Sequence, residues 1–537
     1  MVVPELRAWR AAGPRLARLA RAARPRLARA LKAAGPRIAR PAWTVRERPA
    51  VPRTWQFTAG AATAGLALAA GVVTAAGPWD STGQRTAERD RAIALERAGG
   101  ADHGHRSGTS GRSGTSAASG APDGAPAAPS APPVLAGLTG GGPVVKSAAD
   151  GPALAGVLDP LLADASLGAR RSASVVDVTT GRRLYGRDTG EALTPASTTK
   201  IATAVAALSA LGADHRLTTR AALEPDTGEL VLVGGGDPTL TARENARGRA
   251  SLRTLADRTA AALAQRGVSR VTLSYDTTLY TGPVLHPIGV NENLAPVSAL
   301  MTDEGRTDGS ESGPAPRVAD PAAEAARTFA RLLAAHGVHT TAPGPSKATG
   351  RSQTLATVSS PPLSDLVERM LTNSDNDIAE ALARQTAAAT GGRADFTGGA
   401  AAVTARLKGL GLPLAGAAFH DGSGLNRADK LTTDLLTALL RKAADPAHPE
   451  LRPVLTGLPV AGFTGTLSGR YTEGGAAGVV RAKTGTLTGV NALAGTAVDR
   501  DGHLLAFAFL TEETPSADAA QAALDRAATA LAACGCR

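Results

Sequence analysis

Thr194-Pro-Ala-Ser197-Thr-Thr-Lys200 is followed directly by the apolar run Ile201-Ala-Thr-Ala-Val-Ala-Ala-Leu208. The alanine-rich run predicts a buried helix that begins near Ser197. Lys200 lies three residues after Ser197, so both side chains project from one face of the helix. The positive end of the helix dipole favours negative charge developing on the serine oxygen. The stretch therefore predicts a serine nucleophile with Lys200 as its base. The alternative, a capping serine and a solvated lysine, explains Lys200 poorly because a cation is disfavoured at a helix N-terminus.

A second polar string, Ser374-Asp-Asn376, lies between two helix-like stretches at residues 362–371 and 378–384. By itself it would predict only an ordinary turn or helix cap, because Ser, Asp and Asn are common there. It indicates a catalytic site only in combination with the other two strings.

The third string is Lys483-Thr-Gly485, within the predicted strand Val479–Leu487. Gly485 has no Cβ, so we expect it to let a substrate backbone approach the strand. Lys483 is the expected second cation of the site, and burial of Lys200 beside it would lower the pKa of Lys200.

Each of these strings occurs once, in this order. With Gly234-Gly-Gly-Asp-Pro-Thr-Leu240 and Asp421-Gly-Ser-Gly-Leu425, they resemble the class C low-molecular-mass penicillin-binding proteins, the D-alanyl-D-alanine carboxypeptidases/endopeptidases of the bacterial cell wall. The resemblance runs from about residue 150 to the C-terminus. It implies an α+β fold: a penicillin-binding-protein/β-lactamase-like core, with helices on both faces of an antiparallel sheet, and an inserted accessory domain.

The resemblance also implies roles for individual residues. Ser374 would relay a proton between Lys200 and the leaving amine, and Asn376 would bind the substrate backbone. The N–H groups of Ser197 and Thr486 would form the oxyanion hole. A terminal carboxylate of D-alanine or penicillin would be held by Lys483, Thr484 and Thr486. Asp375 has no assigned role.

The implied activity is that of a serine-type D-Ala-D-Ala carboxypeptidase acting on peptidoglycan stem peptides, with β-lactams as covalent inhibitors and no cofactor or metal. The same site is compatible with cutting D-Ala–diaminopimelate cross-links, and the sequence does not rank the two activities. A β-lactamase and a β-lactam or peptidoglycan sensor are the alternatives. No loop motif supplies the extra base of a class A β-lactamase.

Other polar motifs carry less information. His420-Asp-Gly-Ser423 is too contiguous for a catalytic triad, so we interpret it as structural or as a wall of the site. His103 and His105 lie in a linker-like segment, and no spacing of His, Cys or carboxylates resembles zinc ligation. Gly234-Gly-Gly236 predicts a turn in the accessory domain, away from the chemistry.

The N-terminal region differs in composition from the rest of the chain. Residues 1–54 carry 14 Lys and Arg against 2 Asp and Glu, so the remaining chain is nearly neutral. We therefore expect a basic cytoplasmic tail at residues 1–54, with 11-residue repeats that begin at Ala11, Ala22 and Ala33. The near-neutral folded part argues against nucleic acid as its partner.

Residues 57–77 are an uncharged run between Trp55 and Trp79, and its length fits one membrane crossing. We expect a transmembrane anchor at residues 55–79, with the catalytic part outside the cytoplasm; a signal peptide cleaved near Val73-Thr-Ala75 is the alternative. A flexible Gly/Ser/Pro/Ala linker is expected at residues 80–145.

The remaining chain is long enough for two domains. A hairpin at residues 172–185, strands at 492–498 and 504–510, and a helix at 516–533 would form the core. We place the core at residues 146–212 and 356–537, and the inserted accessory domain at 213–355. Cys534 and Cys536 could form a strained local disulfide or pair between molecules, and the sequence does not decide between these.

Overall fold

The computed structural model describes residues 151–471 and 475–535. The basic tail, the expected anchor, the linker and Cys536 lie outside the described residues. None of the helices in the described ranges is long and apolar enough to cross a membrane.

A five-stranded antiparallel sheet forms the centre of the core, in the order β2-β1-β11-β10-β9. The strands are β1 (Arg170–Asp177), β2 (Arg183–Arg187), β9 (Val480–Leu487), β10 (Val490–Val498) and β11 (Leu504–Glu512). The N-terminal hairpin and the C-terminal strands share this sheet, as the sequence predicts, because β1 pairs with β11. The strand that carries Lys483 lies at its edge.

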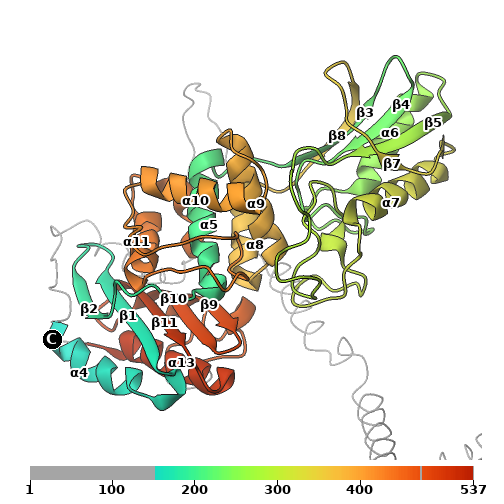
Figure 1. The fold of residues 1–537 in the computed structure, drawn as a ribbon. Helices are drawn as coiled ribbons and strands as arrows, with labels where there is room; N and C mark the ends of the chain where they lie inside the picture. The colour runs from blue at the N-terminus through green and yellow to red at the C-terminus, as the bar shows by residue number, and fades with distance from the viewer. Residues whose placement is uncertain (1–150, 472–474, 536–537) are drawn as a thin grey trace, which may run out of the picture. The chain divides into compact units, whose positions relative to one another are not determined.

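Helices cover both faces of this sheet (Figure 1). The helices on one face are α4 (Gly151–Leu162) and α13 (Ala517–Ala533). The helices on the other side are α5 (Thr199–Leu211), α8 (Leu363–Asn373), α9 (Asn376–Ala389), α10 (Phe396–Gly409), α11 (Thr433–Ala444) and the short α12 (Pro453–Thr456). A separate apolar core fills each side, so the sheet is buried on both faces.

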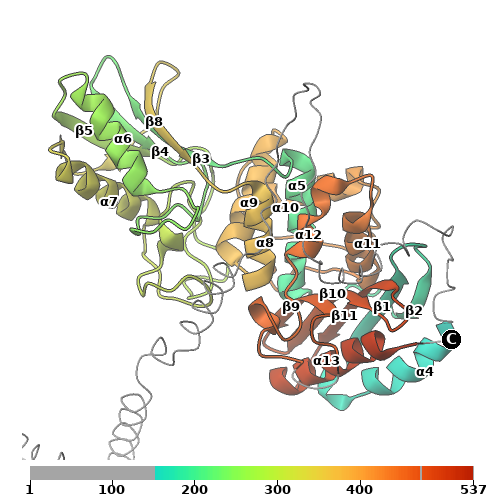
Figure 2. The same cartoon turned by 180° about the vertical axis from the view of Figure 1, so that it is seen from behind.

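A second sheet, of six strands, is built from residues 218–359, in the order β6-β5-β4-β3-β8 with β7 paired to β5. Its strands are β3 (Thr218–Leu223), β4 (Glu229–Val233), β5 (Arg270–Asp276), β6 (His339–Thr340), β7 (Gly344–Pro345) and β8 (Gln353–Ser359). Helices α6 (Leu252–Ala264) and α7 (Pro321–Ala335) pack on it. This inserted domain extends from the helices α8 and α9 of the core, as both views show (Figures 1 and 2).

Two buried helices position the polar strings. Every residue of α5 from Thr199 to Leu208 is buried, and so is every residue of α9 from Asp377 to Ala387. Both helices pack in the same apolar core. A helix that is buried on all sides holds its terminal residues in fixed positions, which is what a preorganised site requires.

Candidate active site

The three polar strings come together at the ends of α5 and α9, beside β9. Ser197 lies in the 3-10 turn Ala196–Thr198 that leads into α5, and Lys200 is in the first turn of that helix. Ser374 ends α8, Asn376 begins α9, and Lys483 lies on β9. The sequence order of the strings is therefore converted into one compact site.

Lys200 is the centre of this site. Its Nζ donates to Ser197 Oγ at 2.9 Å, to Asn376 Oδ1 at 2.6 Å and to the carbonyl of Ser423 at 2.7 Å. A lysine ammonium has three N–H groups, so all of its donors are in use. The Lys200 side chain is fully buried, which excludes the solvated surface lysine of the alternative interpretation.

Burial lowers the pKa of Lys200 from 10.5 to about 8. Nearby negative charge, chiefly on Asp421 and Glu380, opposes this shift and keeps the pKa from falling further. The predicted lowering is thus present, and burial is its main cause. A substantial fraction of Lys200 is neutral at mildly alkaline pH, and only the neutral amine can accept the proton of Ser197.

Lys483 lies next to Ser374, whereas the expected proton relay would place Ser374 in contact with Lys200. Its fully buried Nζ donates to Ser374 Oγ at 2.9 Å and to the Thr484 carbonyl at 2.7 Å. Burial, and then the charge of Lys200, hold the pKa of Lys483 well below its usual value. In this structure Ser374 is therefore held by Lys483, while the N–H groups of Lys200 bond elsewhere.

The Ser374–Asn376 string forms the predicted turn between two helices. Ser374 adopts a left-handed conformation with φ of 59° and ends α8. Asp375, which the sequence leaves without a role, caps α9 by accepting from the N–H of Ile378 at 3.1 Å. The Asn376 amide bridges Lys200 and, through Nδ2, the carbonyl of Asn293 in the inserted domain at 2.9 Å.

The β9 strand presents Thr484 and Thr486 to the site and packs closely against the nucleophile turn. A Cβ added to Gly485 would lie 2.7 Å from the carbonyl oxygen of Pro195. The sequence predicts that this glycine makes room for substrate. The structure shows that the missing side chain makes room for the turn that carries Ser197, so Gly485 lets the strand and this turn pack closely.

A cleft of about 290 Å³ opens over these residues. Five of the predicted site residues line it: Ser197, Ser374, Asn376, Thr484 and Thr486. The inserted domain supplies further lining residues, namely Asn293, Arg306, Ser312, Gly313, Pro314 and Arg317. This contribution of the inserted domain could not be predicted from the sequence, because no local pattern shows where its loops lie.

A buried network of carboxylates and guanidinium groups lies along the cleft. Glu304 accepts from Arg306 and Arg369, each at 2.7 Å, and Asp377 pairs with Arg317 at 2.8 Å. Glu304, Asp375 and Asp377 are close enough to share a metal ion. The three guanidinium groups already neutralise these carboxylates, so we interpret the cluster as an electrostatic junction between the inserted domain and the helices α8 and α9.

The Asp421–Leu425 segment, which we expected to be structural or a wall of the site, contacts Lys200 directly. Ser423 supplies the carbonyl that accepts from Lys200, and its own N–H donates to Glu380 at 2.9 Å. Asp421 bonds to His286 of the inserted domain, not to the adjacent His420. The rejection of a contiguous His-Asp-Ser triad thus agrees with the geometry.

A comparison with protein-family models decides the family. The model of the D-Ala-D-Ala carboxypeptidase 3 (S13) family matches residues 154–315 and 308–531. The chain belongs to this family. The S13 assignment confirms the predicted resemblance to D-alanyl-D-alanine carboxypeptidases and the predicted enzyme class.

Three relatives that are similar in sequence are also named as carboxypeptidases. The chain is 38% identical over 424 residues to a carboxypeptidase of Mycobacterium tuberculosis, covering 75% of this chain and 89% of that protein. It is 37% identical over 398 residues to the carboxypeptidase DacB of Mycolicibacterium smegmatis, covering 71% and 84%. It is 30% identical over 442 residues to a D-alanyl-D-alanine carboxypeptidase of Actinomadura sp., covering 65% and 79%.

A solved structure supports the fold. Penicillin-binding protein 4 of Haemophilus influenzae aligns with a TM-score of 0.59 at 22% identity, covering 70% of this chain and 98% of that one. This likeness confirms the predicted α+β architecture of an antiparallel sheet with helices.

Proposed function

We propose that this S13 family member removes the terminal D-alanine from peptidoglycan stem peptides through an acyl-enzyme on Ser197. The observation that carries this proposal is the 2.9 Å hydrogen bond between Ser197 Oγ and the buried Nζ of Lys200. A nucleophile within hydrogen-bond reach of a base whose pKa is lowered is the arrangement that acyl transfer needs.

In the acylation step, neutral Lys200 accepts the proton of Ser197, and the serine oxygen attacks the carbonyl of the D-Ala–D-Ala bond. The carbonyl oxygen becomes negatively charged and lies between the N–H groups of Ser197 and Thr486. Two preorganised donors at that point stabilise the charge without reorganisation. The terminal carboxylate binds at Thr484 and Thr486, with the ammonium of Lys483 behind them.

When the tetrahedral intermediate collapses, the C–N bond breaks and the leaving amine takes a proton. We propose that Ser374 delivers this proton and takes in exchange the proton that Lys200 removed from Ser197, so Lys200 returns to its neutral form. The hydrogen bond from Lys483 holds the Ser374 hydroxyl in place. D-alanine then leaves. Water attacks the ester, releases the shortened peptide as a carboxylic acid and returns the proton to Ser197.

The same step predicts covalent capture of β-lactams. The Haemophilus influenzae neighbour was also solved in complex with a β-lactam. A β-lactam amide would be opened by Ser197 in the same way as the peptide. The amine that is released stays tethered to the acyl group, so the adduct would persist.

For localisation, we infer that residues 55–79 anchor the protein in the cell membrane, with residues 1–54 in the cytoplasm and the enzyme outside. The uncharged run, its flanking tryptophans and the basic flank support this inference. The mass of the mature N-terminal peptide in purified membranes distinguishes an anchor from a cleaved signal peptide.

A labelling experiment with a fluorescent penicillin tests the proposed function. The full-length wild-type protein should carry a covalent label on a denaturing gel, and Ser197→Ala should carry none. Ser209→Ala is a matched control, because Ser209 lies on the same helix and its hydroxyl bonds the carbonyl of Ala206. Release of D-alanine by Ser197→Ala at the wild-type rate would overturn the assignment of the nucleophile.

A further inference from the structure

His286 of the inserted domain is buried within an otherwise exposed apolar segment. Val284, Leu285 and Ile288 are 50%, 42% and 42% exposed, whereas His286 is 3% exposed. This reverses the usual order, in which apolar side chains are buried and polar ones are exposed. Burying an imidazole is costly unless both of its nitrogens are hydrogen-bonded, so the partners of His286 indicate why it is there.

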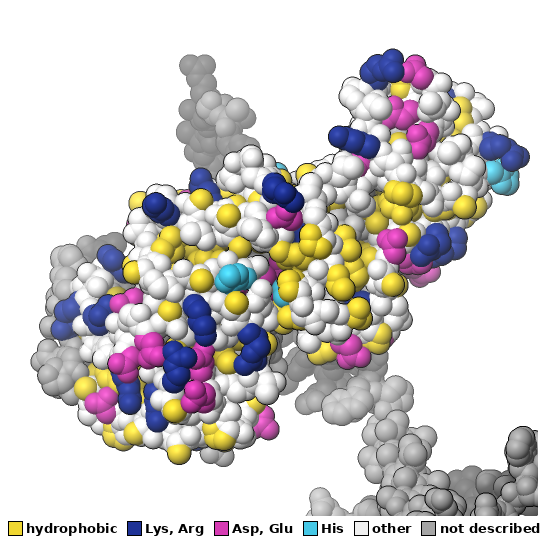
Figure 3. Space-filling view, viewed as in Figure 1, with side chains coloured by type: hydrophobic (Ala, Val, Ile, Leu, Met, Phe, Trp, Pro, Cys, Tyr) yellow, Lys and Arg dark blue, Asp and Glu magenta, His cyan; other side chains and the backbone are white. Residues whose placement is uncertain are grey.

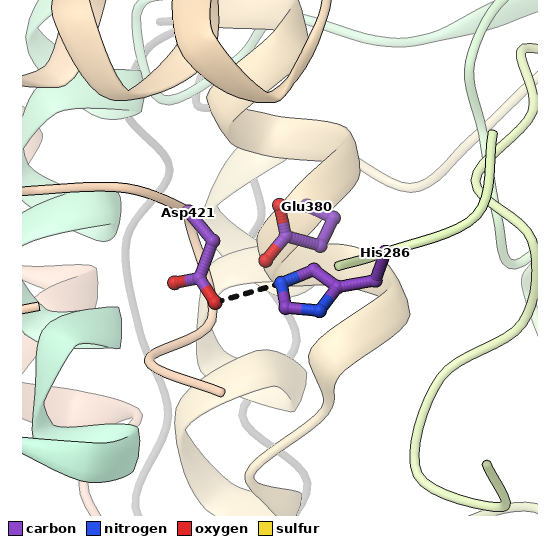
Figure 4. A group of neighbouring side chains, drawn as sticks. All are labelled: His286, Glu380 and Asp421. Atoms are coloured by element: carbon purple, nitrogen blue, oxygen red, sulfur yellow. Dashed lines mark hydrogen bonds and ion pairs between the residues drawn. The ribbon is translucent and has the colours of Figure 1, made fainter. Parts of the chain in front are cut away.

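Both nitrogens of His286 have partners. Nε2 lies 3.0 Å from Asp421 Oδ2, and Nδ1 accepts from the N–H of Ile288 at 3.2 Å. Since Nδ1 accepts, the network assigns the ring proton to Nε2, which donates to Asp421. Figure 4 shows the His286 ring directed at the Asp421 carboxylate, with the Glu380 side chain beside them.

The same three residues are near enough to bind a metal ion. Their lone pairs and protons are already used, however. His286 is bonded at both nitrogens, and Glu380 accepts from the N–H groups of Gly422 and Ser423. We therefore interpret the cluster as a hydrogen-bonded support and not as a metal site.

Asp421 fixes the segment that follows it. Its two carboxylate oxygens accept from the N–H of Gly424 at 2.6 Å and from the N–H of Asn426 at 2.7 Å. Gly424 itself packs against the nucleophile turn, since a Cβ there would lie 2.0 Å from the Ala196 carbonyl oxygen. A shift of Asp421 would therefore move backbone that contacts both the turn carrying Ser197 and the amine of Lys200.

The segment that follows Asp421 also contacts Lys200, the proposed base. Ser423 is two residues from Asp421, and its carbonyl accepts one of the three hydrogen bonds of Lys200. Contacts therefore run without a break from His286 through Asp421 and Ser423 to Lys200.

Residues on one face of α9 contact Lys200, the Ser423 backbone and the segment that carries His286. Asn376, Glu380 and Arg384 follow one another at intervals of four residues, so they lie along one stripe of the helix. Asn376 contacts Lys200 and Glu380 holds the Ser423 backbone. Arg384 donates to the carbonyls of Thr281 and Pro283, which begin the segment that carries His286.

We propose that His286 is a positioning residue for acylation: the inserted domain uses it to hold Asp421 and, through the Ser423 carbonyl, to keep the amine of Lys200 against Ser197. This inference rests on the proposed function. It assigns the inserted domain a part in orienting the base, in addition to lining the cleft.

The charges around Lys200 determine the expected pH effect. The carboxyl groups that face it are those of Asp421, Glu380, Asp375 and the protonated Asp429, and Lys483 is the neighbouring basic group. Without the His286 bond, the Ser423 carbonyl moves away and the ammonium loses one acceptor. The neutral amine is then favoured, so the midpoint of the acylation profile should move to lower pH.

The test measures fluorescent-penicillin acylation of the full-length protein against pH, together with kcat and KM for D-alanine release and the melting temperature. The variants are His286→Leu, His286→Asn and His286→Gln. The Gln amide can reach Asp421 as Nε2 does, whereas the Asn amide is too short. His336→Leu is the matched control, since it removes an exposed His–Asp pair of 2.7 Å from the same domain.

We expect His286→Leu and His286→Asn to lose about 10- to 100-fold in acylation rate and kcat, as misplaced catalytic groups do. KM should change little, and His286→Gln should recover most of the rate. Equal acylation rates and midpoints in wild type and His286→Asn would overturn the inference, as would losses in melting temperature with no change in midpoint. A wild-type protein that is not acylated would overturn the proposed function instead.

Discussion

Lys483 donates a hydrogen bond of 2.9 Å to Ser374, and this bond joins the third string of the site to the second. Lys200 meanwhile bonds Ser197 and Asn376. The two lysines therefore contact different serine hydroxyl groups of the site. Lys200 contacts Ser197, the proposed nucleophile, and Lys483 contacts Ser374, the proposed proton donor to the leaving group.

Removal of the Ser374 hydroxyl should slow turnover whichever residue replaces it. We expect both Ser374→Ala and Ser374→Gly to lower kcat by about 100-fold or more, the usual contribution of a positioned proton donor. The left-handed backbone at Ser374 favours glycine, so Ser374→Gly should unfold at a higher temperature than Ser374→Ala. Equal losses of kcat at different melting temperatures would separate chemistry from folding, and a wild-type kcat in either variant would contradict the role.

Acylation by penicillin should become faster as pH rises and should level off above a midpoint near 8. The rate increases because deprotonation of Lys200, whose pKa burial lowers to about 8, produces the base. Lys200→Arg should abolish acylation at every pH, since a guanidinium group does not deprotonate in proteins. A rate that is independent of pH between 6 and 9 would show that another group limits the reaction.

Two neighbouring aspartates should respond differently to replacement by asparagine. Burial and the charge of Asp421 raise the pKa of Asp429 to about 10, so Asp429 is protonated and resembles an amide. Burial alone would raise the pKa of Asp421, but hydrogen bonds from His286, Asp429 and the backbone bring it to about 2. Asp429→Asn should keep most of the acylation rate. Asp421→Asn should lose it.

The unfolding free energy of Asp429→Asn should also increase relative to that of wild type as pH rises. In the folded protein Asp429 keeps its proton, whereas the unfolded chain releases it above pH 4, so its contribution to wild-type stability falls from pH 5 to pH 8. The variant lacks this contribution. Chemical unfolding at the two pH values measures both unfolding free energies. A variant whose unfolding free energy does not rise relative to wild type between pH 5 and pH 8 would contradict the assigned protonation.

The buried pair between Arg317 and Asp377 should contribute to the junction of the inserted domain with α9. Both side chains are at most 4% exposed, and Arg317→Ala would leave Asp377 buried without its partner. We expect a loss of about 3 kcal/mol in unfolding free energy at pH 8. Burial raises the pKa of Asp377 to about 6, so the loss should shrink at pH 5. Arg331→Ala breaks an exposed pair in the same domain and should cost less than about 1 kcal/mol.

The residue types, spacing and order of the three polar strings, and so the chemistry expected of the site, can be read from the amino-acid sequence alone. Ser197 and Lys200 are three residues apart, and that spacing alone places them on one helical face. The alternation and turn residues near Asp177 and Asp499 likewise predicted strands that β1, β10 and β11 confirm. Local patterns were enough here because the interactions are local. The tail and anchor stay predictions from composition.

Contacts between groups that are distant in the sequence become visible only in the folded chain. The pairing of Ser374 with Lys483, the packing of Gly485 on the Pro195 turn, and the approach of His286 to Asp421 join segments more than 100 residues apart. No periodicity encodes such contacts, because they depend on how the sheet, α9 and the inserted domain pack. A buried histidine among exposed apolar residues becomes visible only when burial is known, since the sequence Val284-Leu285-His286 predicts the opposite exposure.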